Sequence, residues 1–216
     1  MSDFINDQDR AEAIKAWIMK YGTTIFIAII IGIALMYGNQ YLQKKELQTK
    51  EEASMAFEQL LVSSDNKNIK QYQAEAQSLV SNFPKTAYAD LASFLLAKSY
   101  VENKQYKNAI SQLNWVITHS KYSEFKQVAA IRMARIYLYL KDYTKASASL
   151  AKVYDKTYNV MIDQIKGDIV LAQGNVGKAR SLYTKASNDN VNSEILQPLL
   201  TVKLHSLPAQ ISNEAN

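Results

Sequence analysis

Residues 97–116, AKSYVENKQYKNAISQLNWV, align with residues 134–153, ARIYLYLKDYTKASASLAKV, and with residues 167–186, GDIVLAQGNVGKARSLYTKA. The second segment begins 37 residues after the first, and the third begins 33 residues after the second. Repetition at a period of about 20 to 50 residues is the sequence signature of a stacked repeat architecture. The matching positions are Ala97, Tyr100, Tyr106, Ala109, Leu113 and Val116; Ala134, Tyr137, Tyr143, Ala146, Leu150 and Val153; and Gly167, Val170, Val176, Ala179, Tyr183 and Ala186.

The spacing within each copy predicts two antiparallel helices joined by a short polar link. Small residues at the first and fourth matched positions let the two helices approach closely, and the larger ones fill the space between hairpins. A single hairpin cannot bury its apolar face, so several must stack to make a core. This pattern resembles the tetratricopeptide repeat; an irregular helical bundle with chance alanine spacing is the open alternative. The links are 103–105, 141–142 and 174–175.

Further helices are expected on both sides of the three copies. Residues 71–83 are predicted to be the second helix of a degenerate first copy, closed by Pro84, with a helix from Ala53 to Val62 as its partner. Residues 193–206 are predicted to be a capping helix, and the tail 208–216 is expected to be disordered. With 6 Gly and 3 Pro in 216 residues, we predict an all-α fold.

Residues 25–37, IFIAIIIGIALMY, carry no charged side chain and predict a membrane anchor. Thirteen residues are few for a bilayer span, but aromatic side chains flank them as they do at lipid–water interfaces. Tyr21 and Tyr41 are 20 positions apart, about 30 Å along a helix, which matches the hydrocarbon thickness. We predict a transmembrane helix at 23–42. Its anchoring residues are Trp17, Tyr21, Ile25, Tyr37 and Tyr41.

The charges around this segment exclude one alternative and leave another open. A cleaved signal peptide has a short basic leader and a small-residue cleavage site, whereas residues 1–22 are net acidic and no such site follows Tyr37. Basic residues close to the span are balanced, with three before it and three after it, at Arg10, Lys15 and Lys20 and at Lys44, Lys45 and Lys50. The positive-inside rule therefore leaves the orientation undecided.

Composition and motifs favour binding over chemistry. The chain has 0 Cys and 2 His, His119 and His205, so thiolate sites are excluded and a histidine metal centre is not expected. It lacks the glycine-rich, serine-elbow and zinc-helix motifs of common enzyme classes. The net charge of +5 is spread thinly, which argues against nucleic-acid binding. We predict no catalytic, metal or cofactor residues.

A repeat array usually binds partners on its concave face, which the first helices of the hairpins line. This places the candidate partner-binding residues on two such helices. Tyrosines outside the aligned positions are either core, incidental surface or further contacts. The candidates are Ser93, Leu96, Lys98, Val101, Arg132, Arg135 and Leu138.

The chain as a whole resembles YfgM-type proteins, which are ancillary subunits of the bacterial SecYEG translocon. The similarity covers nearly the whole chain, and the order of anchor and then repeats is itself distinctive. The segments that carry it are 12–17 (EAIKAW), Gly22, Gly32, Ala53-Ser54 with Ala56, 89–93 (ADLAS), 131–135 (IRMAR), Gly167-Asp168, Gly174-Asn175 and 179–181 (ARS).

The resemblance implies an inner-membrane protein with residues 1–22 in the cytoplasm, 23–42 in the membrane and repeats at 43–207 in the periplasm. It also implies association with SecYEG and with the periplasmic chaperone PpiD, and contact with unfolded or secreted clients and membrane lipid. We therefore expect a non-enzymatic adaptor or chaperone-like subunit. The alternative is a repeat scaffold that coordinates cell-envelope or cell-division proteins.

Overall fold

The computed structural model describes residues 3–63, 68–189 and 196–208, and within these ranges it is helical with no strand. This confirms the predicted all-α class. The chain divides into two compact units, residues 1–52 and 53–216. The helices are α1 (Asp3–Ser63), α2 (Ile69–Asn82), α3 (Ala87–Glu102), α4 (Tyr106–His119), α5 (Ser123–Tyr139), α6 (Tyr143–Leu150), the 3₁₀ turn η1 (Lys156–Tyr158), α7 (Asn159–Ala172), α8 (Val176–Asp189) and α9 (Leu196–Ser206).

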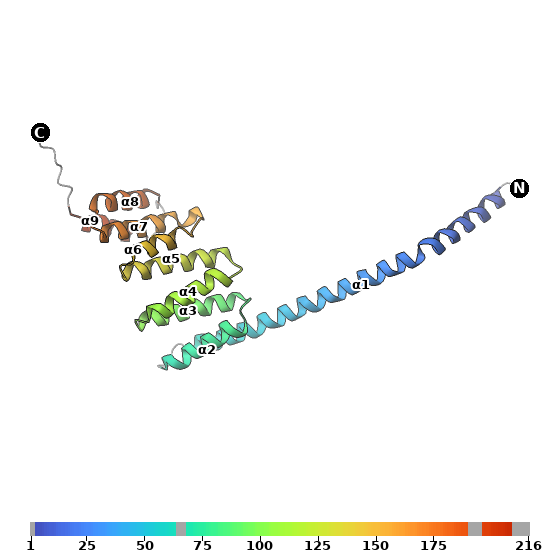
Figure 1. The fold of residues 1–216 in the computed structure, drawn as a ribbon, viewed down its shortest axis with the longest axis horizontal. Helices are drawn as coiled ribbons and strands as arrows, with labels where there is room; N and C mark the ends of the chain where they lie inside the picture. The colour runs from blue at the N-terminus through green and yellow to red at the C-terminus, as the bar shows by residue number, and fades with distance from the viewer. Residues whose placement is uncertain (1–2, 64–67, 190–195, 209–216) are drawn as a thin grey trace, which may run out of the picture. The chain divides into compact units, whose positions relative to one another are not determined.

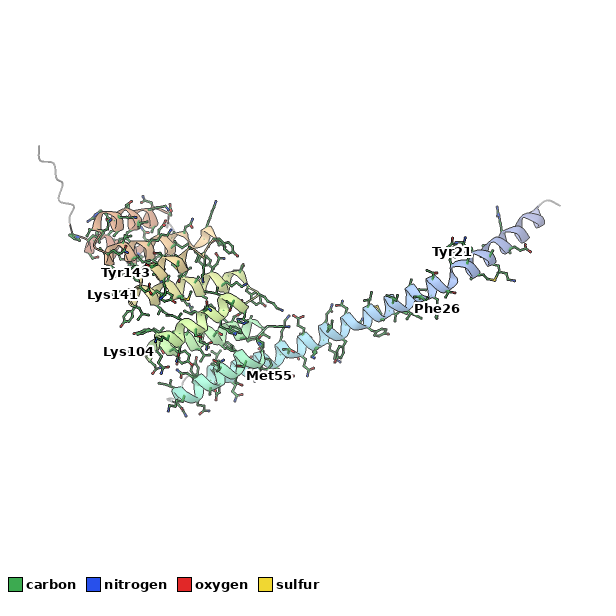
Figure 2. All side chains as sticks on the ribbon, viewed as in Figure 1. Tyr21, Phe26, Met55, Lys104, Lys141 and Tyr143 are labelled. Atoms are coloured by element: carbon green, nitrogen blue, oxygen red, sulfur yellow. The ribbon has the colours of Figure 1, made fainter. Side chains whose placement is uncertain are left out.

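The first unit is a single helical stretch whose apolar side chains are exposed. Among the described residues, the Phe26–Ser63 part of α1 is long and apolar enough to cross a membrane, and none of its apolar window is buried. Trp17, Tyr21, Tyr37 and Tyr41 are all exposed, and Figure 2 shows Tyr21 and Phe26 on this helix. The side chain of Ile25 lies outside the described residues. A helix that is apolar on all sides and buried by nothing is typical of a membrane span.

The second unit is a stack of helical hairpins, with α3–α4, α5–α6 and α7–α8 in order and α9 packed on α8 (Figure 1). The end of α1 from Ala53 packs with α2, and their shared cluster, which includes Leu60, Ala76 and Leu79, continues into α3. The structure thus places both helices of the predicted first copy. Residues 193–195 of the predicted cap and the tail from 209 lie outside the described residues.

The matched small residues lie where the helices cross. Ala109, Ala146 and Ala179 are each completely buried, in three successive hairpins. In the third hairpin a Cβ on Gly167 would overlap the ring of Tyr183. The third copy therefore combines the smallest crossing residue with the largest filling residue, which keeps the spacing of its two helices compact.

The turn within each of the three aligned copies has one residue in the left-handed conformation, at the same position of the repeat. Lys104, Lys141 and Gly174 have φ of 60°, 60° and 86°, at the offsets of 37 and 33 that relate the copies. They close Schellman motifs, which satisfy the last carbonyls of the first helix. Figure 2 shows Lys104 and Lys141 along one edge of this unit. The bonds are Lys104 N–Val101 O and Gln105 N–Tyr100 O, Lys141 N–Leu138 O and Asp142 N–Tyr137 O, and Gly174 N–Leu171 O and Asn175 N–Val170 O.

Candidate partner-binding groove

A cavity of about 390 Å³ lies between α3 and α5, the first helices of two successive hairpins, with α4 beneath it. It forms because two helices that carry small residues at their crossing points, including Ala97, leave room between their exposed faces. We call it the α3–α5 groove. Its lining residues are Phe94, Ala97, Lys98, Val101, Glu102, Leu113, Arg132, Arg135 and Ile136.

The floor of the groove is apolar and belongs to the hydrophobic core. Phe94, Leu113 and Ile136 are buried members of the cluster that holds α3, α4 and α5 together. Val101 is 36% exposed at the mouth of the groove. An apolar side chain from a partner would therefore meet a rigid, preformed surface, which is the usual character of a ligand site.

The rim of the groove carries three cations and one anion. Lys98 Nζ lies 3.8 Å from Glu102 Oε1, an exposed pair one helical turn apart. The guanidinium of Arg132 lies 4.6 Å from the centre of the Phe94 ring, within cation–π distance. Partial burial, followed by the charge of Arg135, lowers the pKa of Arg132, although a guanidinium remains charged at any physiological pH.

A second cavity of about 380 Å³ adjoins the groove and shares Lys98 and Glu102 with it. It lies between α2, α3 and the last turn of α1, and Leu61 and Ile69 on its lining are both nearly half exposed. Burial and the charge of Glu102 raise the pKa of Tyr72, which also lines it. Three successive hairpins thus carry two adjoining hollows.

Four of the seven candidate residues, Lys98, Val101, Arg132 and Arg135, line this groove. Ser93 and Leu96 were placed there wrongly, because both are completely buried. Leu96 packs into the cluster with Leu60 and Leu79, so no partner can reach it in this structure.

The reason lies in helical geometry, because residues three, four, seven or eight positions from Phe94 lie on its side of α3 and those one or two positions away do not. Phe94, Lys98, Val101 and Glu102 follow that spacing on α3, whereas Ser93 and Leu96 point toward the preceding hairpin. The spacing therefore identifies Phe94 and Glu102, which the sequence analysis missed. Leu138 does not line the groove; it is half-buried against the cluster that joins α5, α6 and α7.

Within the described residues there is no group of three or more His, Asp or Glu side chains arranged to hold a metal ion. The most buried carboxylate, Asp90, accepts a hydrogen bond of 2.8 Å from Ser120 Oγ. It ties the start of α3 to the residue that follows α4. Its role in this position is structural.

Comparison with known proteins agrees with this architecture. A family model described as a tetratricopeptide repeat-like domain matches residues 15–209. Proteins named ancillary SecYEG translocon subunit align over 96% of this chain, with 30% identity in Aggregatibacter actinomycetemcomitans and 26% in Haemophilus influenzae, covering 100% of both relatives. The chain belongs to this family.

The Escherichia coli member is 22% identical, over 96% of this chain and 99% of its own length. The family resemblance predicted from the sequence is thereby confirmed, for the anchor and the repeats together. No solved structure matches the chain significantly.

Proposed function

We propose that this chain is a non-enzymatic, single-pass inner-membrane subunit associated with the SecYEG translocon, which binds polypeptide segments in the α3–α5 groove. The names of its full-length relatives support the association, and the groove supports the binding. The observation that carries the proposal is a preformed apolar floor with a charged rim between the first helices of two successive hairpins.

The topology belongs to the same proposal. Residues 1–22 lie in the cytoplasm, 23–42 span the membrane between aromatic belts, and the repeat domain at 43–207 lies in the periplasm, ahead of a short tail at 208–216. Membrane lipid contacts the exposed apolar side chains of α1.

The anchor and the groove act together. A segment emerging from a translocon held in the same membrane meets the groove at a high effective concentration, so weak contacts suffice for capture. Partners of this kind are unfolded or secreted clients and a membrane-bound periplasmic chaperone such as PpiD. Groove residues that exclude water from an apolar side chain supply the affinity.

Site-specific photocrosslinking in intact cells tests the binding. A benzoylphenylalanine in place of Val101, at the mouth of the groove, is expected to capture SecY, PpiD or secreted chains in transit. The same probe at Val202 on α9, 65% exposed and outside the groove, is the matched control. Capture of division or envelope proteins instead would favour the scaffold alternative. Equal capture at both positions would remove the groove from the proposal.

The orientation has its own test, because a chain with 0 Cys accepts single cysteines without background. A membrane-impermeant maleimide is expected to label Lys121→Cys in intact cells with a permeabilised outer membrane. Arg10→Cys should react only after the inner membrane is broken. The reverse result would place the repeats in the cytoplasm.

A further inference from the structure

Two guanidiniums at the rim of the groove have no carboxylate partner. Within the described residues, every ion pair of the repeat domain involves a lysine, and no acidic side chain lies within ion-pair distance of Arg132 or Arg135. Glu102, the one carboxylate lining the groove, is paired with Lys98.

Three other buried or half-buried carboxylates of the stack have partners of their own. On α7, Asp163 pairs with Lys185 at 2.7 Å, and Asp168 accepts a 2.6 Å hydrogen bond from Tyr183 and pairs with Lys203. At the start of α3, Asp90 accepts from Ser120. Asp163 and Asp168 thus have lysine partners and Asp90 has a hydroxyl partner, whereas no carboxylate among the described residues pairs with the arginines of the groove.

The Arg132 guanidinium is also held in place by its contact with the Phe94 ring. Arg132 and Arg135 are three positions apart on α5, so they share one face, and the Arg132 guanidinium lies over the Phe94 ring. Partial burial, followed by the charge of Arg135, lowers the pKa of Arg132, and an anion between the two guanidiniums would relieve their repulsion. A planar guanidinium that is already oriented loses little entropy on binding a carboxylate.

We propose that the α3–α5 groove selects peptide segments in which a carboxylate lies next to an apolar side chain. The apolar side chain packs on Phe94, Val101 and Ile136, and the carboxylate accepts charge-assisted hydrogen bonds from Arg132 and Arg135. This inference rests on the proposed function, because it names the chemistry of the segments that the groove takes.

Fluorescence anisotropy of matched peptides tests it, with the full chain in nanodiscs of zwitterionic phosphatidylcholine so that lipid charge does not compete. One labelled peptide carries leucine and phenylalanine followed by two glutamates, and its partner has glutamines in place of the glutamates. We expect the acidic peptide to bind at least tenfold more tightly, the size of effect given by hydrogen bonds to charged groups. Raised salt should reduce that preference.

Two variants separate the groove from general charge. Arg132→Gln with Arg135→Gln should abolish the preference and leave the amide peptide's affinity within about twofold. Lys121→Gln with Lys156→Gln removes the same charge from exposed sites outside the groove and should keep the preference.

Equal affinity of the wild-type chain for both peptides, or an undiminished preference in the arginine variant, would overturn the inference and leave groove binding intact. Binding of neither peptide, together with no capture at Val101 in cells, would remove the groove function as well.

Discussion

The hairpin α7–α8 differs from the two hairpins before it in how it fills the same space. Each of the two earlier hairpins has an alanine opposite a leucine, at Ala97 and Leu113 and at Ala134 and Leu150. The third hairpin has Gly167 opposite Tyr183. Tyr183 is completely buried, and its hydroxyl donates to Asp168 at 2.6 Å. Burial, with that bond, raises the pKa of Tyr183, so it stays a neutral donor. The repeat conserves the volume at a helix crossing and leaves the identity of its residues free to change.

The copies also differ at a buried polar position near the start of their first helices. Asp90, Gln127 and Val160 are related by the repeat offsets of 37 and 33. Asp90 accepts a hydrogen bond from Ser120, and Gln127 Oε1 accepts from the backbone N–H groups of Tyr154 and Asp155. In each case the donor lies in the segment that leads to the next hairpin. Val160 instead packs in the cluster of the last hairpin. In hairpin α7–α8 this position is therefore apolar and makes no such hydrogen bond.

The largest effect is expected from Gly167→Ala, because the new Cβ overlaps the Tyr183 ring. Overpacking of this kind should cost about 2 kcal/mol in the free energy of unfolding. Urea titration of the full chain in detergent, followed by circular dichroism, measures it. Ala134→Gly is the comparison in hairpin α5–α6 and should cost about 1–2 kcal/mol, through helix propensity and the loss of a buried methyl group but without overlap.

Adding Tyr183→Leu to Gly167→Ala recreates the alanine–leucine pair of the other copies. The loss in the double variant should be smaller than the sum of the two single losses by at least about 1 kcal/mol. Strict additivity would mean that the two residues are not coupled through shared space.

Gln127→Leu should come next, since it keeps the volume but removes the acceptor of two backbone bonds, 3.0 Å from Tyr154 N and 2.8 Å from Asp155 N. Leaving these two backbone N–H groups without an acceptor should lower the free energy of unfolding by about 2 kcal/mol, and by less if water reaches them. Gln112→Leu, on an exposed glutamine bonded to Gln77, is the control and should change stability by less than about 0.5 kcal/mol. Equal losses in both variants would contradict the attachment role of Gln127.

Asp90 gives hairpin α3–α4 a buried titratable group at the position where hairpin α5–α6 has the neutral Gln127. Burial raises its pKa, with the Ser120 bond and Lys126 acting in the opposite direction. The folded state therefore holds this proton more tightly than the unfolded state, so stability rises as pH falls from the raised pKa toward the ordinary aspartate value. The wild-type chain should gain stability over that interval relative to Asp90→Asn, in urea titrations repeated at each pH.

Asp142→Asn is the control, because the pKa of Asp142 is shifted in the opposite direction to that of Asp90. Hydrogen bonds from the Lys145 side chain and backbone lower the pKa of Asp142, so its contribution is present above the ordinary aspartate value and is lost as pH falls through the lowered one. Removing it should make the chain less sensitive to acid. A pH profile that is the same in wild type and Asp90→Asn would show that Asp90 does not titrate in this range.

The repeat fold could be predicted from the sequence because its determinants are local and recur at fixed offsets. The sequence also predicted part of the groove lining, because Lys98 and Arg135 lie on first helices. Ser93 and Leu96 did not, because a stacked helix is covered on two sides and membership of the first helix does not say which side faces the groove. The links from Asp90 to Ser120 and from Gln127 to Tyr154 join residues about thirty positions apart through a bend between helices. No sequence period encodes the geometry of that bend.

The smallest effects concern the hairpin turns, where Gly174 takes the left-handed conformation at low cost and Lys104 and Lys141 take it with a Cβ. Lys104→Gly and Lys141→Gly should each stabilise the chain by about 0.5–1 kcal/mol, and Gly174→Ala should destabilise it by about 1 kcal/mol. Thermal melts of the three variants check the signs. Lys166→Gly, at an exposed position in the middle of α7, is the contrasting control and should destabilise the chain, because glycine in a helix interior loses more backbone entropy on folding. A loss of stability in both turn variants would mean that the lysine side chains hold these turns by contacts of their own, and the equivalence of the three turns would then be one of shape and not of energy.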